Sequence, residues 1–252
     1  YIEKAGRGKA GFDFTRLNAN GDEQDASADT WSCVRDNVTG LVWEVKTDDG
    51  GLQDKDYLYS WYSDDTNGGY TGDENGDDTS CSLTSCNTQA YENALNEQGL
   101  CGFYDWRMPT HHELFTLMHL GLSDSIAIDE DYFPYTGTVG TDPVWYWTSV
   151  PSADGVNSED AQNAWALDFD SGVDNFLNKS SAARVRFFSY PLETLSRMRQ
   201  RSSRSIVNGA PACFSSSPVA AVASLNWNIN WASTTSQPVL QEIQLRSEAV
   251  RI

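Results

Sequence analysis

The sequence has no continuous apolar run of about 18 residues, the length that a helix needs to cross a bilayer. No membrane insertion is therefore expected in this chain. No signal peptide is visible either, and the first residue is Tyr1 rather than methionine, so we expect a processed or truncated N-terminus. At 252 residues the chain is long enough to bury a sizeable core.

Histidine is rare, and the sequence lacks the common catalytic motifs. The three histidines are His111, His112 and His119, and His112-Glu113 begins like the zinc-protease motif H-E-x-x-H. Thr116 stands in place of the second histidine, so that motif fails. His112 and His119 could share a metal on one helix face, although ordinary surface or core-edge positions explain them better. No phosphate loop, nucleophile elbow or dinucleotide fingerprint stands in a fitting context, so we do not expect an enzyme.

Cysteine never occurs in a C-x-x-C pair, which argues against a structural zinc site. The five cysteines are Cys33, Cys81, Cys86, Cys101 and Cys213. Disulfides formed in an oxidising compartment are the better interpretation, with Cys33, Cys81, Cys86 and Cys101 as the candidates. Spacing does not give the pairs, but the closeness of three cysteines predicts at least one local bridge. The odd count leaves one cysteine free or intermolecular.

Lysine is scarce, and the chain carries a formal charge of −19. Residues 1–183 hold 33 acidic and 9 basic residues, whereas residues 184–252 hold 3 acidic and 8 basic residues. The acidic body should repel nucleic acid and anionic lipid, so neither is expected as a partner. A body and a tail of opposite charge could attract each other within one chain or between chains. The solubility of an extracellular protein explains the acidity more simply.

Two helices are expected, followed by short strands. Residues 87–98 should form the first helix, with Asn87 as its N-cap. Thr110 and Glu113 form a capping box that should start a second helix reaching about Leu120. Short strands are expected at residues 33–34, 41–45, 144–149, 164–169 and 183–188. Helices combined with short antiparallel strands and long loops predict an α+β fold.

Residues 47–80 form a long excursion rich in Asp, Gly and Asn. Loops of this length are usually functional or stabilised by an ion. Asp73, Asn75 and Asp77 alternate near its end, a pattern typical of calcium loops, so calcium is a candidate cofactor. The bidentate glutamate that would complete an EF-hand is missing, and plain turns produce the same composition more often.

Residues 189–252 differ in composition from the preceding chain, and we expect them to form a C-terminal extension. Pro191–Ser205 is a candidate for a short amphipathic helix that carries several arginines. Residues 224–246 predict a long β-hairpin, since apolar and polar residues alternate in them. Such a hairpin needs cover from the body or from a neighbouring subunit. The candidate assembly residues are Leu225, Trp227, Ile229 and Trp231.

Ten short motifs follow one another along the body of the chain. They are Trp31–Val34, Asp36–Glu44, Leu100–Gly102, Asp105–Thr110, Glu113-Leu114, Ile128-Asp129, Tyr132–Pro134, Tyr146–Ser149, Ala164-Trp165 and Val185-Arg186. Together they resemble the Lcl C-terminal domain family, named for a bacterial collagen-like adhesin. The resemblance implies a domain over residues 1–188 with a C-type-lectin-like fold, distantly like that of formylglycine-generating enzymes. It implies a surface or secreted location and no catalytic residue, and residues 189–252 lie outside it.

A binding role is the expected function, namely an extracellular bacterial surface protein whose loops mediate adhesion by recognising a glycan or protein ligand. Residues 57–70 and 145–165 are the candidate ligand surfaces. The candidate ligand-binding residues are Tyr59, Trp61, Tyr62, Trp145 and Tyr146. Core packing is an equal or better explanation for other aromatic residues, among them Trp147 and Trp165.

Two further functions compete with adhesion. The first is a structural subunit of a cell-surface filament or pilus-like assembly, a homo-oligomer that uses the C-terminal hairpin for contacts between copies. The second is an oxidase like the formylglycine-generating enzymes. Only the family resemblance suggests this function. That chemistry needs a copper-binding cysteine pair late in the domain, where only Cys213 stands, so it is disfavoured.

Overall fold

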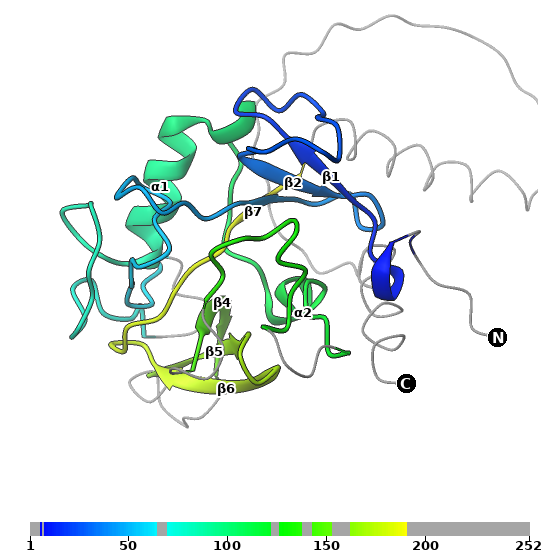
Figure 1. The fold of residues 1–252 in the computed structure, drawn as a ribbon. Helices are drawn as coiled ribbons and strands as arrows, with labels where there is room; N and C mark the ends of the chain where they lie inside the picture. Colours follow the sequence, from blue (N-terminus) through cyan, green and yellow to red (C-terminus); the bar gives the residue numbers. More distant parts are fainter. Residues whose placement is uncertain are drawn as a thin grey trace, which may run out of the picture.

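The part of the chain that the structure describes folds into two antiparallel sheets and a small number of helices (Figure 1). The computed structural model describes residue 6 and residues 8–64, 70–121, 126–137, 143–152 and 162–190. These residues confirm the α+β class expected from the sequence. The predicted C-terminal helix, the predicted hairpin with its four assembly residues, and Cys213 all lie outside the described residues.

The first sheet has the strand order β1-β2-β3-β7. Its strands are β1 Phe14–Leu17, β2 Cys33–Asp36, β3 Val42–Glu44 and β7 Phe188–Ser189. A tight turn joins β2 to β3, because Gly40 adopts φ 78° and its N–H donates to the Asp36 carbonyl at 2.7 Å. Since β7 pairs with β3, this sheet joins the early and late parts of the described chain.

The second sheet contains β4 Trp145–Pro151, β5 Asn163–Asp168 and β6 Val173–Asn178. The Asp168 carboxylate accepts hydrogen bonds from the backbone N–H groups of Asp170 and Ser171 and so closes the turn before β6. The sequence did not predict β6, because almost all of its side chains are exposed and the apolar alternation of a half-buried strand is missing.

The predicted strand over residues 183–188 is wrong for most of its length. Ala183 and Arg184 form only single bridges, to Tyr59 and Tyr146, and the strand proper begins at Phe188. The apolar residues there pack into the core from an irregular segment, so their pattern indicates burial rather than a continuous strand.

The first helix, α1 Thr88–Gln98, begins and ends as predicted. The Asn87 side-chain oxygen accepts a hydrogen bond from the Ala90 N–H at 2.8 Å, which caps the start of the helix. Gly99 adopts the left-handed conformation at its end, with φ 66°. Both boundaries therefore depend on residues within one turn of the helix end, which is why the sequence alone predicts them.

The second helix, α2 His111–Phe115, starts at the predicted capping box but is shorter than predicted. It ends at Phe115 and does not reach Leu120. Beyond it the Met118 N–H donates to the Phe115 carbonyl, three residues back, and the His119 N–H donates to the Ala127 carbonyl at 2.9 Å. A tertiary hydrogen bond thus replaces the next helical one and turns the chain away.

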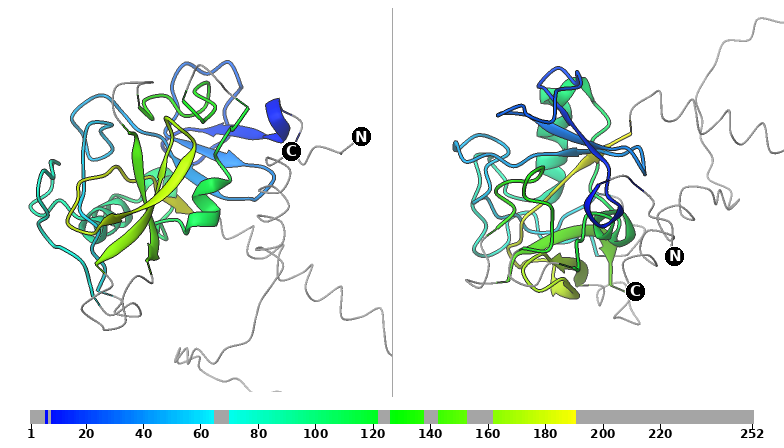
Figure 2. Two further views of the ribbon diagram at one scale, coloured as in Figure 1. Left: turned by 90° about the horizontal axis from the view of Figure 1, so that it is seen from below. Right: turned by 45° about the vertical axis from the view of Figure 1, so that its right-hand side comes forward.

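Two buried hydrophobic clusters lie on opposite faces of the strands. Cys33 and Val42 belong to one cluster, whereas their chain neighbours Val34 and Trp43 belong to the other. Because side chains alternate along a strand, the first sheet is buried on both faces. In the views of Figure 2 the two sheets occupy different parts of the body, and α2 packs against β4 and β5.

Two disulfides confirm the four cysteine candidates. Cys33–Cys101 links β2 to the short 3₁₀ helix Leu100–Gly102 across a sequence separation of 68, and Cys81–Cys86 is the local bridge, with a separation of 5. In the ranges that the structure describes, no helix is long and apolar enough to span a bilayer.

Candidate functional site

The best candidate for a ligand site is a cavity of about 450 Å³, which we name the Tyr62 cavity. Its size falls within the range of small-ligand pockets. Residues 57–70 and 145–165, the two candidate ligand surfaces, both contribute to its wall. The wall includes Trp61, Tyr62, Tyr70, Gln89, Glu92 and Ser149. A larger cavity of about 660 Å³ has a mostly apolar wall, in which none of the predicted ligand residues takes part among those described.

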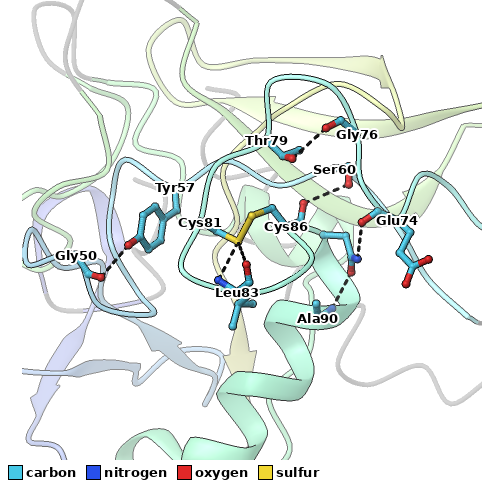
Figure 3. The surroundings of a disulfide bond; sticks show 11 residues. Gly50, Tyr57, Ser60, Glu74, Gly76, Thr79, Cys81, Leu83, Cys86 and Ala90 are labelled. Carbon is cyan, nitrogen blue, oxygen red and sulfur yellow. Dashed lines mark hydrogen bonds between the residues drawn. A yellow bond between two sulfur atoms is a disulfide. The ribbon is translucent and has the colours of Figure 1, made fainter.

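Backbone pairing holds one wall of the cavity against the start of α1. The Ser60 N–H donates to the Cys86 carbonyl at 3.0 Å, and the Thr88 N–H donates to the Ser60 carbonyl at 3.0 Å. The Tyr62 N–H donates to the Thr88 hydroxyl at 2.9 Å, and this hydroxyl donates to the Tyr62 carbonyl at 2.7 Å. The Cys81–Cys86 disulfide closes the loop that leads into α1 (Figure 3). Tyr62 therefore stands on a rigid support.

A buried lysine holds two of the aromatic residues in place. Lys179 Nζ lies 4.1 Å from the centre of the Trp61 ring and donates to the Tyr70 carbonyl at 2.6 Å. The Trp61 indole N–H donates to the Thr148 carbonyl at 2.8 Å, which ties this wall to β4. Trp61 is only 4% exposed, whereas Tyr70 is 38% exposed. Tyr70 and the half-buried Tyr62 are therefore the rings that a ligand can reach.

Two polar groups of the cavity have shifted pKa values. The Tyr62 hydroxyl donates to Asp64 Oδ1 at 2.9 Å, and this hydrogen bond raises the pKa of Tyr62. Burial raises the pKa of Glu92, an effect that the Met108 backbone N–H opposes. Burial thus affects Glu92, whereas the hydrogen bond to Asp64 affects Tyr62, and both side chains carry groups that can form hydrogen bonds with a ligand.

The guanidinium in the wall is already paired. Arg107 Nη2 donates to Glu113 Oε1 at 2.6 Å and Arg107 Nη1 donates to Glu113 Oε2 at 3.1 Å. Burial raises the pKa of Glu113, but Arg107 and the Thr110 donors outweigh this effect and hold the pKa of Glu113 below its usual value. The same guanidinium lies 4.2 Å from the centre of the Phe188 ring. The wall thus offers little positive charge to an anionic ligand.

The structure divides the five predicted ligand-binding residues. Trp61 and Tyr62 line the Tyr62 cavity. Tyr59 and Tyr146 are 1% and 0% exposed, so both are core residues, and Trp145 is half-buried and stands outside the cavity wall. Tyr59, Tyr146 and Trp145 are therefore not part of the proposed ligand site.

The sequence analysis missed the part of the wall that α1 provides, which includes Gln89 and Glu92. Tyr70 and Ser149 lie within the two candidate ranges but were not singled out. Gln89 and Glu92 are three residues apart, so helical periodicity places them on one side of α1. This spacing could have been used to predict that the two side chains lie together on one side of the helix. Only the pairing of α1 with Ser60 and Tyr62, however, shows that this side of the helix borders a cavity.

The predicted calcium residues lie in a loop of tight turns. The Asn75 N–H donates to Asp73 Oδ1 at 3.0 Å, and Asn75 and Asp77 are exposed. Of the three histidines, His111 contacts the Asp174 carboxylate with its Nε2 at 2.8 Å, whereas the sequence suggested His112 and His119 as a metal pair. No group of three or more His, Cys, Asp or Glu side chains that could hold a metal ion occurs among the described residues. Calcium binding stays a prediction.

A second concentration of polar chemistry is buried in the core. The Glu44 carboxylate accepts hydrogen bonds from the Tyr91 hydroxyl at 2.5 Å and from the Phe187 N–H at 2.7 Å, and it lies 3.1 Å from Lys46 Nζ. Arg186 donates to the Glu44 carbonyl at 2.8 Å. Burial lowers the pKa of Lys46 to about 8, although Glu44 opposes the shift. A well-bonded network without access to solvent specifies the core and is not a ligand site.

Comparison with known proteins gives one family match. The model of the family described as the Lcl C-terminal domain matches residues 32–189, more than half of the chain. The matched range contains both disulfides and the whole wall of the Tyr62 cavity, but not β1. No curated protein and no solved structure matches the chain.

Proposed function

We propose, from the premise that the chain belongs to the Lcl C-terminal domain family, that it is an extracellular bacterial surface protein for adhesion, and that it binds a glycan in the Tyr62 cavity. A C-type-lectin-like arrangement of the α+β fold is part of the proposal. Catalysis is not. The family match and the two disulfides support an oxidising, extracellular setting.

The observation that carries the proposal is the mixed character of the cavity wall. Sugar rings present apolar C–H faces as well as hydroxyl groups, so their sites combine aromatic surfaces with convergent polar groups. Tyr62 and Tyr70 supply reachable rings, while Gln89, Glu92 and Ser149 supply donors and acceptors. The disulfide-closed loop and α1 provide the rigid base that such a site needs.

The charges of the cavity restrict the class of glycan. Arg107 is neutralised by Glu113, and Glu92 adds a carboxylate to the wall. The chain as a whole carries a charge of −19. A sulfated or otherwise anionic glycan would meet repulsion, so the proposed ligand is neutral or amino-substituted.

A glycan array followed by titration calorimetry on the full chain tests this function. Tyr62→Ala and Glu92→Gln should each weaken binding about tenfold or more, because each removes a group of the cavity wall that the ligand contacts. Tyr135→Ala is the matched control, since Tyr135 is 48% exposed and lies outside the wall. An array without a hit, or equal losses for all three variants, would rule out the proposed site. Repeating the titration after calcium removal tests the candidate cofactor.

A structural subunit is the second candidate function, and an edge strand favours it. Among the described strands β6 pairs with β5 alone, and its Val173 and Phe176 side chains are 51% and 46% exposed. Light scattering on the native full chain checks this candidate. A subunit should form oligomers or filaments that Phe176→Lys weakens, whereas a monomer at high concentration contradicts the assembly role.

A further inference from the structure

The two disulfides differ in how accessible they are to solvent. Cys33 and Cys101 are 0% and 1% exposed and belong to a buried hydrophobic cluster. Cys81 and Cys86 are half-buried and pack against the outside of this cluster. In thiol–disulfide exchange a thiolate attacks one sulfur of the bridge, so the rate depends on access to that sulfur. Of the two described bridges, Cys81–Cys86 is therefore the one that a thiol in solution can attack.

The loop that Cys81–Cys86 closes has few other constraints. Among the described residues, the backbone groups of residues 82–85 form no hydrogen bond with another backbone group. Ser82 and Thr84 are exposed. A segment with exposed residues and without backbone hydrogen bonds opens at a small free-energy cost. A thiol can therefore approach this bridge while the core stays folded, whereas an attack on Cys33–Cys101 requires the core to open.

A hydrogen bond to sulfur indicates which half of the bridge leaves. The Leu83 N–H donates to Cys81 Sγ at 3.3 Å (Figure 3). A donor at this position stabilises negative charge on the sulfur, and a sulfur that carries negative charge more easily is the better leaving group. Attack is therefore expected at Cys86 Sγ, with Cys81 leaving as the thiolate.

The bridge also lies where two parts of the Tyr62 cavity wall join. The Cys86 carbonyl accepts from the Ser60 N–H at 3.0 Å and from the Ser60 hydroxyl at 3.3 Å. The next residue, Asn87, caps α1 and donates through Nδ2 to the Glu74 carbonyl at 2.9 Å. The bridge thus holds the start of α1, which carries part of the wall, against the segment that leads to Tyr62.

We propose that Cys81–Cys86 is a site of reversible thiol–disulfide exchange with a dithiol in the surrounding medium, and that the state of this bridge controls how firmly the wall of the Tyr62 cavity is held. A thiolate of the dithiol attacks Cys86 Sγ, the bond between the two cysteine sulfurs breaks, and Cys81 leaves as a thiolate. The second thiol of the reagent attacks the mixed disulfide and releases the Cys86 thiolate. Two electrons pass to the protein, the two thiol protons of the reagent end on the two cysteines, and the dithiol becomes a disulfide. The reverse reaction restores the bridge.

Timed reduction of the native full chain by dithiothreitol tests the exchange. Free thiols are trapped with N-ethylmaleimide, and mass spectrometry of the peptides gives the rate for each cysteine. Cys81 and Cys86 should be labelled at least about tenfold faster than Cys33 and Cys101, because only the first pair is accessible in the folded body. Equal rates, or faster reduction of Cys33–Cys101, would overturn the proposal.

Brief exposure to a monothiol, glutathione, tests the direction of attack. After trapping, the mixed disulfide should be found on Cys86 and the free thiol on Cys81. A mixed disulfide that forms mainly on Cys81 would contradict the role assigned to the Leu83 N–H.

Hydrogen exchange before and after reduction tests the link to the cavity wall. Reduction should speed the exchange of the Ser60, Tyr62 and Thr88 amides, which bond across the two segments, about tenfold. In Cys81→Ser/Cys86→Ser these amides should exchange fast with or without dithiothreitol, which controls for reduction of the other cysteines. The amides of β5 should be unchanged throughout. Unchanged exchange at the three amides after the bridge is reduced would overturn the link.

These measurements use no ligand, so their outcome is separate from that of the proposed function. The consequence for binding does rest on that function. With a glycan identified on the array, reduction of the bridge should weaken binding about tenfold, because the site loses its preorganisation. An affinity that stays the same on reduction would overturn control of binding by the bridge, whereas an array without a hit contradicts the proposed function alone.

Discussion

A network of buried charged and polar side chains lies in the core and consists of Glu44, Lys46, Tyr91 and Arg186. All four are buried, and hydrogen bonds connect each of them to another member of the group. Their arrangement across β3, α1 and the segment before β7 could not be read from sequence spacing. Burial and charged partners change the pKa values of such groups, so the free energy of unfolding should depend on pH because of this network.

Lys46 gives the first prediction, a rise of stability with pH. Burial lowers its pKa from 10.5 to about 8, so the unfolded chain binds more protons than the folded chain between these values. The free energy of unfolding should therefore increase from about pH 8 to pH 10. Above that range the effect reverses, because burial raises the pKa of Tyr91 above 10.0 and the unfolded tyrosine loses its proton first.

Urea unfolding at a series of pH values measures this dependence. The rise between pH 8 and pH 10 should disappear in Lys46→Met. Lys55→Met is the control and should keep the rise, since Lys55 pairs with Asp48 and Asp56 at the surface. A midpoint that stays level or falls over this range in the unmodified protein would show that the lysine is not withdrawn from solvent as described.

Among the helices and strands, the sequence signals that act over a few residues gave correct predictions of where both helices begin and where α1 ends. The Asn87 cap, Gly99 and the capping box of Thr110 and Glu113 all stand where the sequence indicated. The end of α2 depends instead on the hydrogen bond between His119 and Ala127, and the missed strand β6 depends on its pairing with β5. A cap is formed by residues next to the helix end, so the sequence shows it directly. The hydrogen bond at the end of α2 is instead a tertiary one that replaces the next helical one.

Loss of the α2 cap should therefore have a measurable, local cost. Thr110→Ala removes the hydroxyl that accepts from the Glu113 N–H and donates to Glu113 Oε2. The expected loss is about 1 kcal/mol of unfolding free energy. Denaturant unfolding measures it, with the exposed Thr84→Ala as the matched control, for which a change below about 0.5 kcal/mol is expected. Equal effects of the two substitutions would mean that the cap contributes nothing.

For the whole molecule, long-range links join segments that are distant in sequence. The Cys33–Cys101 disulfide ties the first sheet to the residues before α2, and the pairing of β7 with β3 brings Tyr190 beside the same region. The Tyr62 cavity likewise needs α1, β4 and the residue 57–70 excursion at once. Both cavities are therefore products of tertiary structure and not of any single motif.

The two disulfides should differ in their contribution to stability. Chain entropy assigns about 4 kcal/mol to Cys33–Cys101, with its separation of 68, and about 2 kcal/mol to Cys81–Cys86, with its separation of 5. Urea unfolding of Cys33→Ser/Cys101→Ser and of Cys81→Ser/Cys86→Ser compares them. Each double variant serves as the control for the other, and a larger loss from the local pair would contradict the entropic ranking.

The sequence alone was sufficient for the α+β class, for the family resemblance, and for the residues that form disulfides. It also predicted one complete helix and the start of another, because caps and turns are made by neighbouring residues. It pointed to residues 57–70 and 145–165 as ligand surfaces but did not separate the reachable Tyr62 from the buried Tyr59 and Tyr146. The sequence does not distinguish buried from exposed aromatic residues, because tertiary packing decides which of them face water.

The tertiary structure alone decided which cysteines pair, where α2 stops, and which side of α1 meets a cavity. The Cys33–Cys101 pair and the contact of α1 with Ser60 and Tyr62 join segments tens of residues apart, for which composition and periodicity carry no signal. The end of α2 depends on the hydrogen bond between His119 and Ala127, which helical periodicity does not reveal. The same holds for the larger cavity, of about 660 Å³, whose wall includes Leu17 near one end of the described chain and Tyr190 at the other.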